Sequence, residues 1–245
     1  MARSNLDFKP LYSSYPNLRD TIVDWLPMDT KELFEKNKKD KRQLQKLKMY
    51  GWLDNKFSYR FNKQGFRCDD FDHTQRDSIV FLGCSNTVGI GLPYEKTHPY
   101  IVSKELNLKC YNLGKGGGSN DSAFRIGSYW IPILKPKLVC MLTPSKERLE
   151  VIECNGEVNN ILPSRQPKVF KTFYQHWLLN DNNSTLNQEK NLNAINWICH
   201  ETQVPFVQLS VDYLYQHIKD TARDLSHPGV MSQKIVADKF LQLLS

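Results

Sequence analysis

Four short apolar runs, separated by longer amphipathic segments, constrain the fold of this chain most. The runs are SIVFL at 78–82, KCYNL at 109–113, LVCML at 138–142 and PFVQL at 205–209. A continuous apolar run of this length is typical of a strand buried on both faces of a parallel sheet. The segments between the runs are long enough to hold helices, so the pattern predicts right-handed strand–helix–strand crossovers.

Helical periodicity recurs between and after these runs. We expect helices over 97–106, 119–134, 185–200 and 228–244, where apolar residues repeat at helical spacing. Strands that alternate with helices predict an α/β protein, namely a three-layer α/β/α sandwich with a parallel, flavodoxin-like sheet. The pattern is lost over about 144–184, where we expect an irregular insertion.

Residues 1–77 precede the first predicted strand, and we interpret them as an N-terminal extension to a domain that spans 78–245. One helix is expected over 31–50. Eight Lys or Arg and three Asp or Glu between Lys31 and Lys48 carry +5 of the formal charge of +7. The basic character is therefore local, and it does not favour nucleic-acid binding by the main domain. Binding through the basic helix stays open as a separate hypothesis.

Composition and patterning exclude several classes of protein. No run approaches the roughly 18 apolar residues that a membrane span needs, and the first residues lack a signal-peptide stretch, so we expect a cytoplasmic protein. The six cysteines form no C-x-x-C motif, and we expect them to be reduced and mostly buried. No Cys/His cluster has zinc spacing, so neither a metal nor another cofactor is expected. The Lys- and Asn-rich composition is typical of an AT-rich genome, such as a viral one. Nothing in the sequence indicates an oligomeric state.

Residues able to carry chemistry stand where the predicted strands end. Ser85 follows the first strand, a Gly-rich loop (GKGGGS) follows the second, and DLSHP, with Asp224 and His227, precedes the last helix. Ligands bind parallel sheets at the carboxyl ends of the strands. A Ser hydroxyl needs a base to act as a nucleophile, and His is suited to this role because its pKa lies near neutral pH. An Asp three residues before the His can orient the imidazole. This set therefore predicts nucleophilic acyl transfer.

These motifs resemble those of the SGNH/GDSL hydrolases over roughly residues 58–244. FLGCSNTVGIG is similar to the nucleophile block of that family, NLGKGGGSND to its second block, and DLSHP to its D-x-x-H block, while YRFNKQGFR resembles the lead-in of some members. The resemblance implies a Ser85–His227–Asp224 triad, with the backbone N–H groups of Ser85 and Gly117 forming the oxyanion hole. It implies an esterase or acylhydrolase without a cofactor, which acts on a small-molecule or carbohydrate ester.

Two positions depart from the family pattern. The Asp that usually precedes the nucleophile is Cys84 here, and Cys84 stays as an alternative nucleophile. The third block lacks its Asn, which donates to the oxyanion in the family. Thr143, Ser145 or Lys146 could donate instead, and Asn86 or Asn120 could turn inward to do so. The family's glycine donor could also be Gly118, one residue after Gly117. The missing Asn also keeps a second hypothesis open: a catalytically impaired binding or structural protein that assembles through its extension.

Two further residues are candidates for substrate binding. Asn86 follows the proposed nucleophile and could turn inward, and Arg148 follows the third predicted strand. Arg148 would bind an acidic or sugar substrate. The competing interpretation is a structural ion pair between Arg148 and Glu150.

Overall fold

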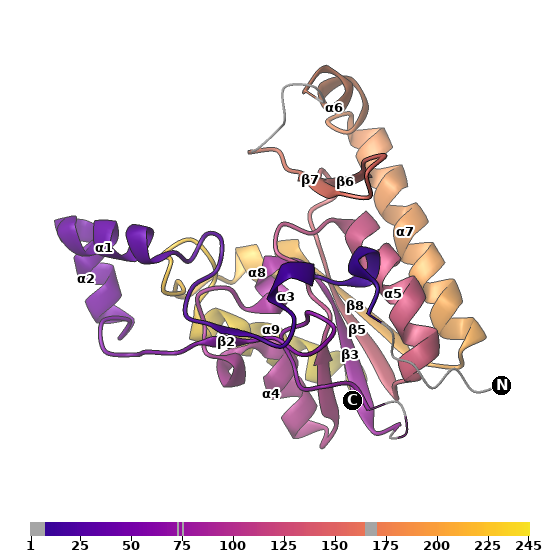
Figure 1. The fold of residues 1–245 in the computed structure, drawn as a ribbon, viewed down its shortest axis with the longest axis horizontal. Coiled ribbons are helices and arrows are strands. Elements are labelled where there is room, and N and C mark those ends of the chain that lie inside the picture. Colours follow the sequence, from indigo (N-terminus) through magenta and orange to yellow (C-terminus); the bar gives the residue numbers. More distant parts are fainter. Residues whose placement is uncertain (1–7, 73, 75, 165–170) are drawn as a thin grey trace.

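The computed structural model describes residues 8–72, 74, 76–164 and 171–245. Its core is a parallel sheet of four strands in the order β4-β3-β5-β8 (Figure 1). The strands coincide with the predicted apolar runs: β3 (Ser78–Gly83), β4 (Lys109–Asn112), β5 (Leu138–Thr143) and β8 (Phe206–Ser210). Numbered along the chain, the order is 2-1-3-4, as in the flavodoxin-like arrangement. Together with helices on both faces, this confirms the predicted α/β/α class.

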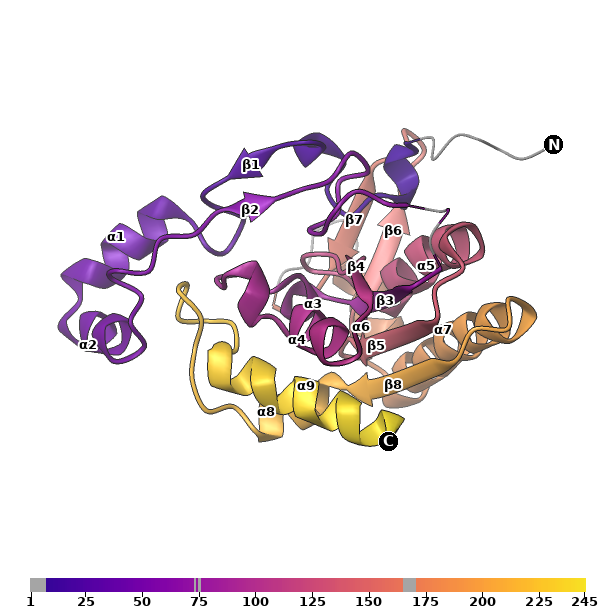
Figure 2. The same ribbon diagram turned by 90° about the horizontal axis from the view of Figure 1, so that it is seen from below.

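Side chains of each strand alternate between the two faces of the sheet. In β3, Val80 and Leu82 pack in one apolar cluster with α5 (Asn120–Leu134) and α7 (Asp181–Glu201). Ile79 and Phe81 pack in a second cluster on the other face. That face is covered by α4 (His98–Glu105), α8 (Val211–Gln216) and α9 (Val230–Leu244). The apolar runs are continuous because both faces of each strand pack against helices. Figure 2 shows these two groups of helices on opposite sides of the sheet.

The four helices expected around the sheet form at the predicted places, as α4, α5, α7 and α9. The expectation of one helix over 31–50 is wrong, because α1 (Lys31–Lys39) and α2 (Lys41–Met49) are separate helices. Asp40 between them has extended backbone (φ −87°, ψ 123°). Its carboxylate accepts the N–H groups of Arg42 and Gln43, each at 2.9 Å, and so caps α2.

The segment expected to be irregular contains regular structure, so that expectation is also wrong. β6 (Leu149–Ile152) and β7 (Val158–Ile161) form an antiparallel hairpin, α6 (Lys171–Trp177) follows, and α7 already begins at Asp181. Residues 165–170 lie outside the described part of the chain. The hairpin strands are short and mixed in polarity, which is why an apolar run does not reveal them.

The N-terminal extension packs against the sheet domain through specific contacts. Its strands β1 (Ile22–Val23) and β2 (Tyr59–Arg60) pair antiparallel, while α1 and α2 project from one end of the molecule (Figures 1 and 2). The Trp52 indole N–H donates to the carbonyl oxygen of Thr221 at 2.8 Å. The buried guanidinium of Arg67 donates to the backbone carbonyl oxygens of Val88, Gly89 and Leu92, which lie a few residues after β3. The proposed division at residue 77 stays a prediction.

The structure also shows the state of the cysteines, the length and apolarity of the helices, and whether possible metal ligands cluster. All six cysteines are free thiols, five of them buried and Cys154 exposed. Across the described ranges, no helix is long and apolar enough to cross a membrane. The same residues contain no cluster of three or more His, Cys, Asp or Glu that could hold a metal ion.

Candidate active site

Asp224 and His227 form a tightly joined pair in the loop before α9. His227 Nδ1 donates to Asp224 Oδ2 at 2.5 Å. The other carboxylate oxygen, Oδ1, accepts the backbone N–H groups of Ser226 at 3.1 Å and of His227 at 3.0 Å. The Asp224 side chain is fully buried, and that of His227 is 14% exposed. Because Nδ1 carries the proton that Asp224 accepts, Nε2 is the basic nitrogen of the ring.

Ser85 is the first residue of the short helix α3 (Ser85–Val88), and only Cys84 separates it from the end of β3. Ser85 and His227 line the same pocket, which has a volume of about 800 Å³. Within the described chain, no hydrogen bond joins the Ser85 hydroxyl to His227. Cys84, the alternative nucleophile, is fully buried and is not part of the pocket lining.

Backbone donors at the pocket differ in whether their N–H groups are occupied. Gly116 N donates to the Tyr15 hydroxyl at 3.1 Å, and Gly118 N donates to the carbonyl oxygen of Lys115 at 2.9 Å. The N–H groups of Ser85 and Gly117 donate no hydrogen bond to any described residue, and both residues line the pocket. The two donors that the sequence motifs single out are therefore available to a ligand.

The alternative oxyanion donors lie elsewhere. The described residues that line the pocket do not include Gly118, Asn120, Thr143, Ser145 or Lys146. Asn120 Nδ2 donates to the carbonyl oxygen of Pro144 at 3.2 Å, and the Ser145 hydroxyl donates to a neighbouring carboxylate. Lys146 Nζ forms an ion pair with Asp181 at 2.5 Å. The side-chain donors of Asn120, Ser145 and Lys146 are thus used within the protein.

Arg148 lines the pocket and is half-buried. Its Nη1 donates to the carbonyl oxygen of Gly118 at 3.3 Å. The alternative that Arg148 pairs with Glu150 is wrong, because Glu150 forms a buried ion pair with Arg125 on α5. In that pair, Arg125 Nε lies 2.5 Å from Glu150 Oε1 and Nη2 lies 2.8 Å from Oε2.

Asn86 occupies a different position from the one expected. It is buried and is not among the residues that line the pocket. Its side-chain Nδ2 donates to the hydroxyl of Tyr215 at 3.3 Å, and its backbone carbonyl oxygen accepts from Gln233 Nε2 at 3.0 Å. Tyr215 does line the pocket, so Asn86 contacts a pocket residue without lining the pocket itself.

Residues of the N-terminal extension also line the pocket, which the sequence did not predict. They are Tyr15, Pro27 and Met28. A Cβ on Gly116 would lie 2.5 Å from the Tyr15 hydroxyl oxygen, so the close approach of this tyrosine requires a glycine. Burial raises the pKa of Tyr15, so its hydroxyl stays protonated and can donate to a ligand while accepting from Gly116. No local motif marks Tyr15, because its partner lies 101 positions away.

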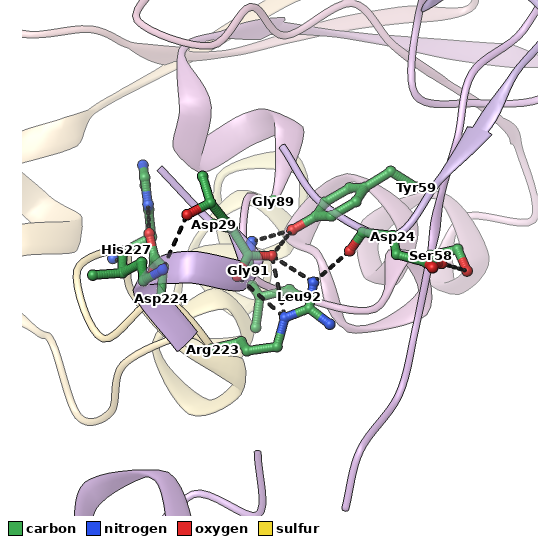
Figure 3. A network of polar contacts seen from close by, with 12 residues as sticks. Asp24, Asp29, Ser58, Tyr59, Gly89, Gly91, Leu92, Arg223, Asp224 and His227 are labelled. Atoms are coloured by element: carbon green, nitrogen blue, oxygen red, sulfur yellow. Dashed lines mark hydrogen bonds and ion pairs between the residues drawn. The ribbon is translucent and has the colours of Figure 1, made fainter. Parts of the chain in front are cut away.

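Asp29 of the extension holds the loop that carries the Asp–His pair (Figure 3). Its carboxylate accepts from Arg223 Nη2 at 2.7 Å and from Nε at 3.1 Å. The Tyr59 hydroxyl donates to the same carboxylate and accepts the N–H of Gly91 at 2.7 Å. Gly91 in turn accepts the N–H of Arg223 at 3.0 Å. Since Arg223 directly precedes Asp224, this network fixes the backbone next to the pair.

No family model and no curated protein matches this chain. Among solved structures, an acetyl xylan esterase, AlAXEase, is similar at 13% identity and a TM-score of 0.37, over 69% of this chain and 100% of its own. A GDSL-like lipase from Bacteroides thetaiotaomicron is similar at 15% identity and a TM-score of 0.32, over 69% of this chain and 88% of its own. Similarity this low transfers neither an activity nor a residue role to this chain.

Proposed function

We propose that this protein is a serine esterase of the SGNH type, which cleaves an ester through an acyl-enzyme. One observation carries the proposal. Ser85, the unoccupied N–H of Gly117 and a histidine oriented by Asp224 all meet at one pocket. These are the three functions that acyl transfer needs: a nucleophile, an oxyanion donor and a base.

The reaction proceeds in two steps. His227 Nε2 takes the proton of the Ser85 hydroxyl while Oγ attacks the ester carbonyl carbon. The N–H groups of Ser85 and Gly117 donate to the oxyanion that forms, and the alcohol leaves with the proton held by His227. A water molecule then attacks the acyl-enzyme with the same base, which releases the acid and restores Ser85. Asp224 keeps the histidine tautomer and stabilises the imidazolium throughout.

Asn160 on β7 is a candidate for the third oxyanion donor. It would take the role of the Asn that is missing from the third block of the sequence. Asn160 lines the pocket, and its Nδ2 lies 3.9 Å from the point where a Cβ on Gly117 would stand. The Ser122 hydroxyl lies 3.4 Å from Asn160 Oδ1 but donates to Glu150 Oε2 at 2.6 Å, and Asn160 Nδ2 donates to no described residue, so its N–H groups are available to a ligand. The missing motif Asn therefore does not by itself favour a catalytically impaired protein.

The pocket supports an ester larger than a simple acetate. Its volume of about 800 Å³ falls in the range of about 300–1,000 Å³ that is usual for small-molecule sites. Several hydroxyl and amide side chains line it: Tyr15, Asn159, Asn160, Ser164 and Tyr215. Such groups bind hydroxyl-bearing molecules, which suits a carbohydrate ester with a small acyl group.

Steady-state hydrolysis of 4-nitrophenyl acetate tests the proposal. We expect Ser85→Ala and His227→Ala each to lower kcat by about 10³-fold or more, because the nucleophile and its base act as one unit. Cys84→Ala is the matched control and keeps most of the activity, since Cys84 is outside the pocket lining. Wild-type turnover in Ser85→Ala, or its loss in Cys84→Ala with the fold intact, would contradict the assignment.

A further inference from the structure

Arg148 carries the only permanent charge among the described residues that line the pocket. No Asp or Glu belongs to that lining. The carboxylates nearest to Arg148 in the sequence have other partners, since Glu150 pairs with Arg125 and Glu147 accepts from Ser145. A half-buried cation that faces a pocket without a counter-charge attracts an anion from solution.

Most N–H groups of the Arg148 guanidinium have no acceptor among the described residues. It has five N–H groups, and its one side-chain hydrogen bond within the described residues runs from Nη1 to the carbonyl oxygen of Gly118. The remaining donors are arranged as a planar fork, which matches a carboxylate or phosphate in a two-point hydrogen bond. Gly118 directly follows Gly117, so Arg148 is anchored beside the proposed oxyanion donor.

A second basic residue of this loop, Lys115, does not line the pocket, and burial lowers its pKa. Lys115 precedes the glycines, is 9% exposed and has no ion-pair partner among the described residues. The neighbouring Arg125 and Glu150 neutralise each other. The charge that faces the pocket therefore comes from Arg148 alone among the described lining residues, and no carboxylate of that lining opposes it.

We infer that the ester cleaved at this site carries an anionic group, and that Arg148 binds that group. The inference rests on the proposed function, because it names the substrate class of the same pocket. The anionic group belongs either to the acyl part or to the alcohol part of the ester. If Arg148 instead only clamps the Gly-rich loop through Gly118, its removal changes the turnover of charged and neutral esters alike.

Two matched substrate pairs separate these cases. The first compares 4-acetoxybenzoate with 4-acetoxybenzamide and places the charge on the alcohol part. The second compares 4-nitrophenyl hydrogen succinate with 4-nitrophenyl butyrate and places it on the acyl part. In at least one pair, Arg148→Gln should lower kcat/KM for the anion by about 10- to 100-fold, mainly through KM, which is the loss expected for a hydrogen bond to a charged group.

The neutral ester of the same pair should change by less than about threefold, and Arg148→Lys should recover part of the loss because it restores the charge. For each ester, dividing the kcat/KM of the variant by that of the wild type cancels the different chemical reactivity of the esters. Equal losses for the charged and neutral esters of both pairs overturn the inference and show that Arg148 acts on the loop alone.

Binding to Ser85→Ala keeps this test independent of turnover. Calorimetric titration of that variant with each of the four esters should show tighter binding of the anion in the pair that responds, and Arg148→Gln in the same background should remove the preference. If no ester is hydrolysed but the preference is present, the proposed function fails, and only the binding of an anionic group by Arg148 is supported. If neutral esters are hydrolysed without any charge preference, this inference fails alone. If neither hydrolysis nor preference is found, both fail.

Discussion

Asp29 and Arg223, which are 194 positions apart in the sequence, form a buried ion pair with 2.7 Å between Oδ2 and Nη2. The Arg223 side chain is 5% exposed and that of Asp29 is 1% exposed. The pair connects the N-terminal extension to the residue before Asp224. The extension is therefore a structural support of the proposed catalytic loop as well as a wall of the pocket.

Removal of the Asp29 charge should destabilise the protein and loosen this loop. In Asp29→Asn, the buried guanidinium of Arg223 loses its counter-charge, which typically costs about 3–5 kcal/mol. We expect a loss of this order in the free energy of unfolding by urea, and faster hydrogen exchange over residues 222–228.

Asp24→Asn is the matched control for that change. Asp24 contacts Arg223 through its backbone carbonyl oxygen, at 2.7 Å from Nη2, and its own carboxylate accepts from the exposed Ser58 hydroxyl. The control should therefore leave stability and exchange near the wild type. Similar losses in both variants would show that the Asp29–Arg223 pair has no special role.

Gly91 should matter to activity beyond its effect on stability. It has φ +79°, and a Cβ there would lie 2.7 Å from the Ala222 Cβ and 3.3 Å from Asp224 Oδ1. Gly91→Ala should displace the catalytic loop and lower kcat by about 10-fold or more, as misplaced catalytic groups do. Gly51 has φ +72° and nothing within 4 Å of its Cβ position, so Gly51→Ala applies the same backbone strain without the clash. Equal esterase activity in the two variants would contradict the prediction.

Asn160→Ala should lower kcat by about 10²–10³-fold if its amide donates to the oxyanion, with a smaller effect on KM. Asn159→Ala is the control, because Asn159 also lines the pocket but its Nδ2 donates to Glu153 Oε1 at 2.6 Å. Kinetics with 4-nitrophenyl acetate compare the two. If kcat of Asn160→Ala stays within about threefold of the wild type, the backbone donors suffice on their own.

The stability of the fold should decrease in mild acid because of His98. This ring is fully buried, its Nδ1 lies 2.6 Å from Gln233 Oε1, and burial lowers its pKa from 6.5 to about 4. The unfolded chain therefore binds this proton below pH 6.5, whereas the folded protein binds it only near pH 4. The free energy of unfolding is therefore highest above pH 6.5. The His98 contribution lowers it as the pH falls toward 4, by about 3 kcal/mol in total.

Urea unfolding at pH 7.5 and at pH 4.5 measures this effect. The wild type should lose about 2–3 kcal/mol more between the two pH values than His98→Gln, which has no titrating ring. Other groups that titrate in this range contribute equally to both proteins. The same loss in both would show that His98 is accessible to protons in the folded state.

Local signals in the sequence predicted the sheet and the Asp–His pair well. The apolar runs located all four strands of the parallel sheet, because burial on both faces demands a continuous apolar segment. Asp224 and His227 are three positions apart, so one turn of the chain brings the carboxylate to the ring. Ser85 could be named because it lies just beyond the end of a predicted strand, and Gly117 because the Gly-rich loop resembles the second block of the SGNH/GDSL hydrolases.

Contacts between distant segments were not predictable in the same way. Tyr15 and Asp29 reach the site from an extension that has no strand or motif to fix its path, and their partners are 101 and 194 positions away. Proximity in sequence was misleading for Glu150, which pairs with Arg125 on another element rather than with Arg148. The break at Asp40 was missed because the apolar spacing continues on both sides of it.

The central claim is that Ser85 is a nucleophile activated by His227. Treatment with a fluorophosphonate, followed by digestion and mass spectrometry, tests this claim directly, because the reagent forms a stable adduct only with an activated hydroxyl. We predict one adduct on the peptide that contains Ser85, unchanged in Cys84→Ala and lost in His227→Ala. An adduct at another residue, or undiminished labelling of Ser85 in His227→Ala, would contradict the account.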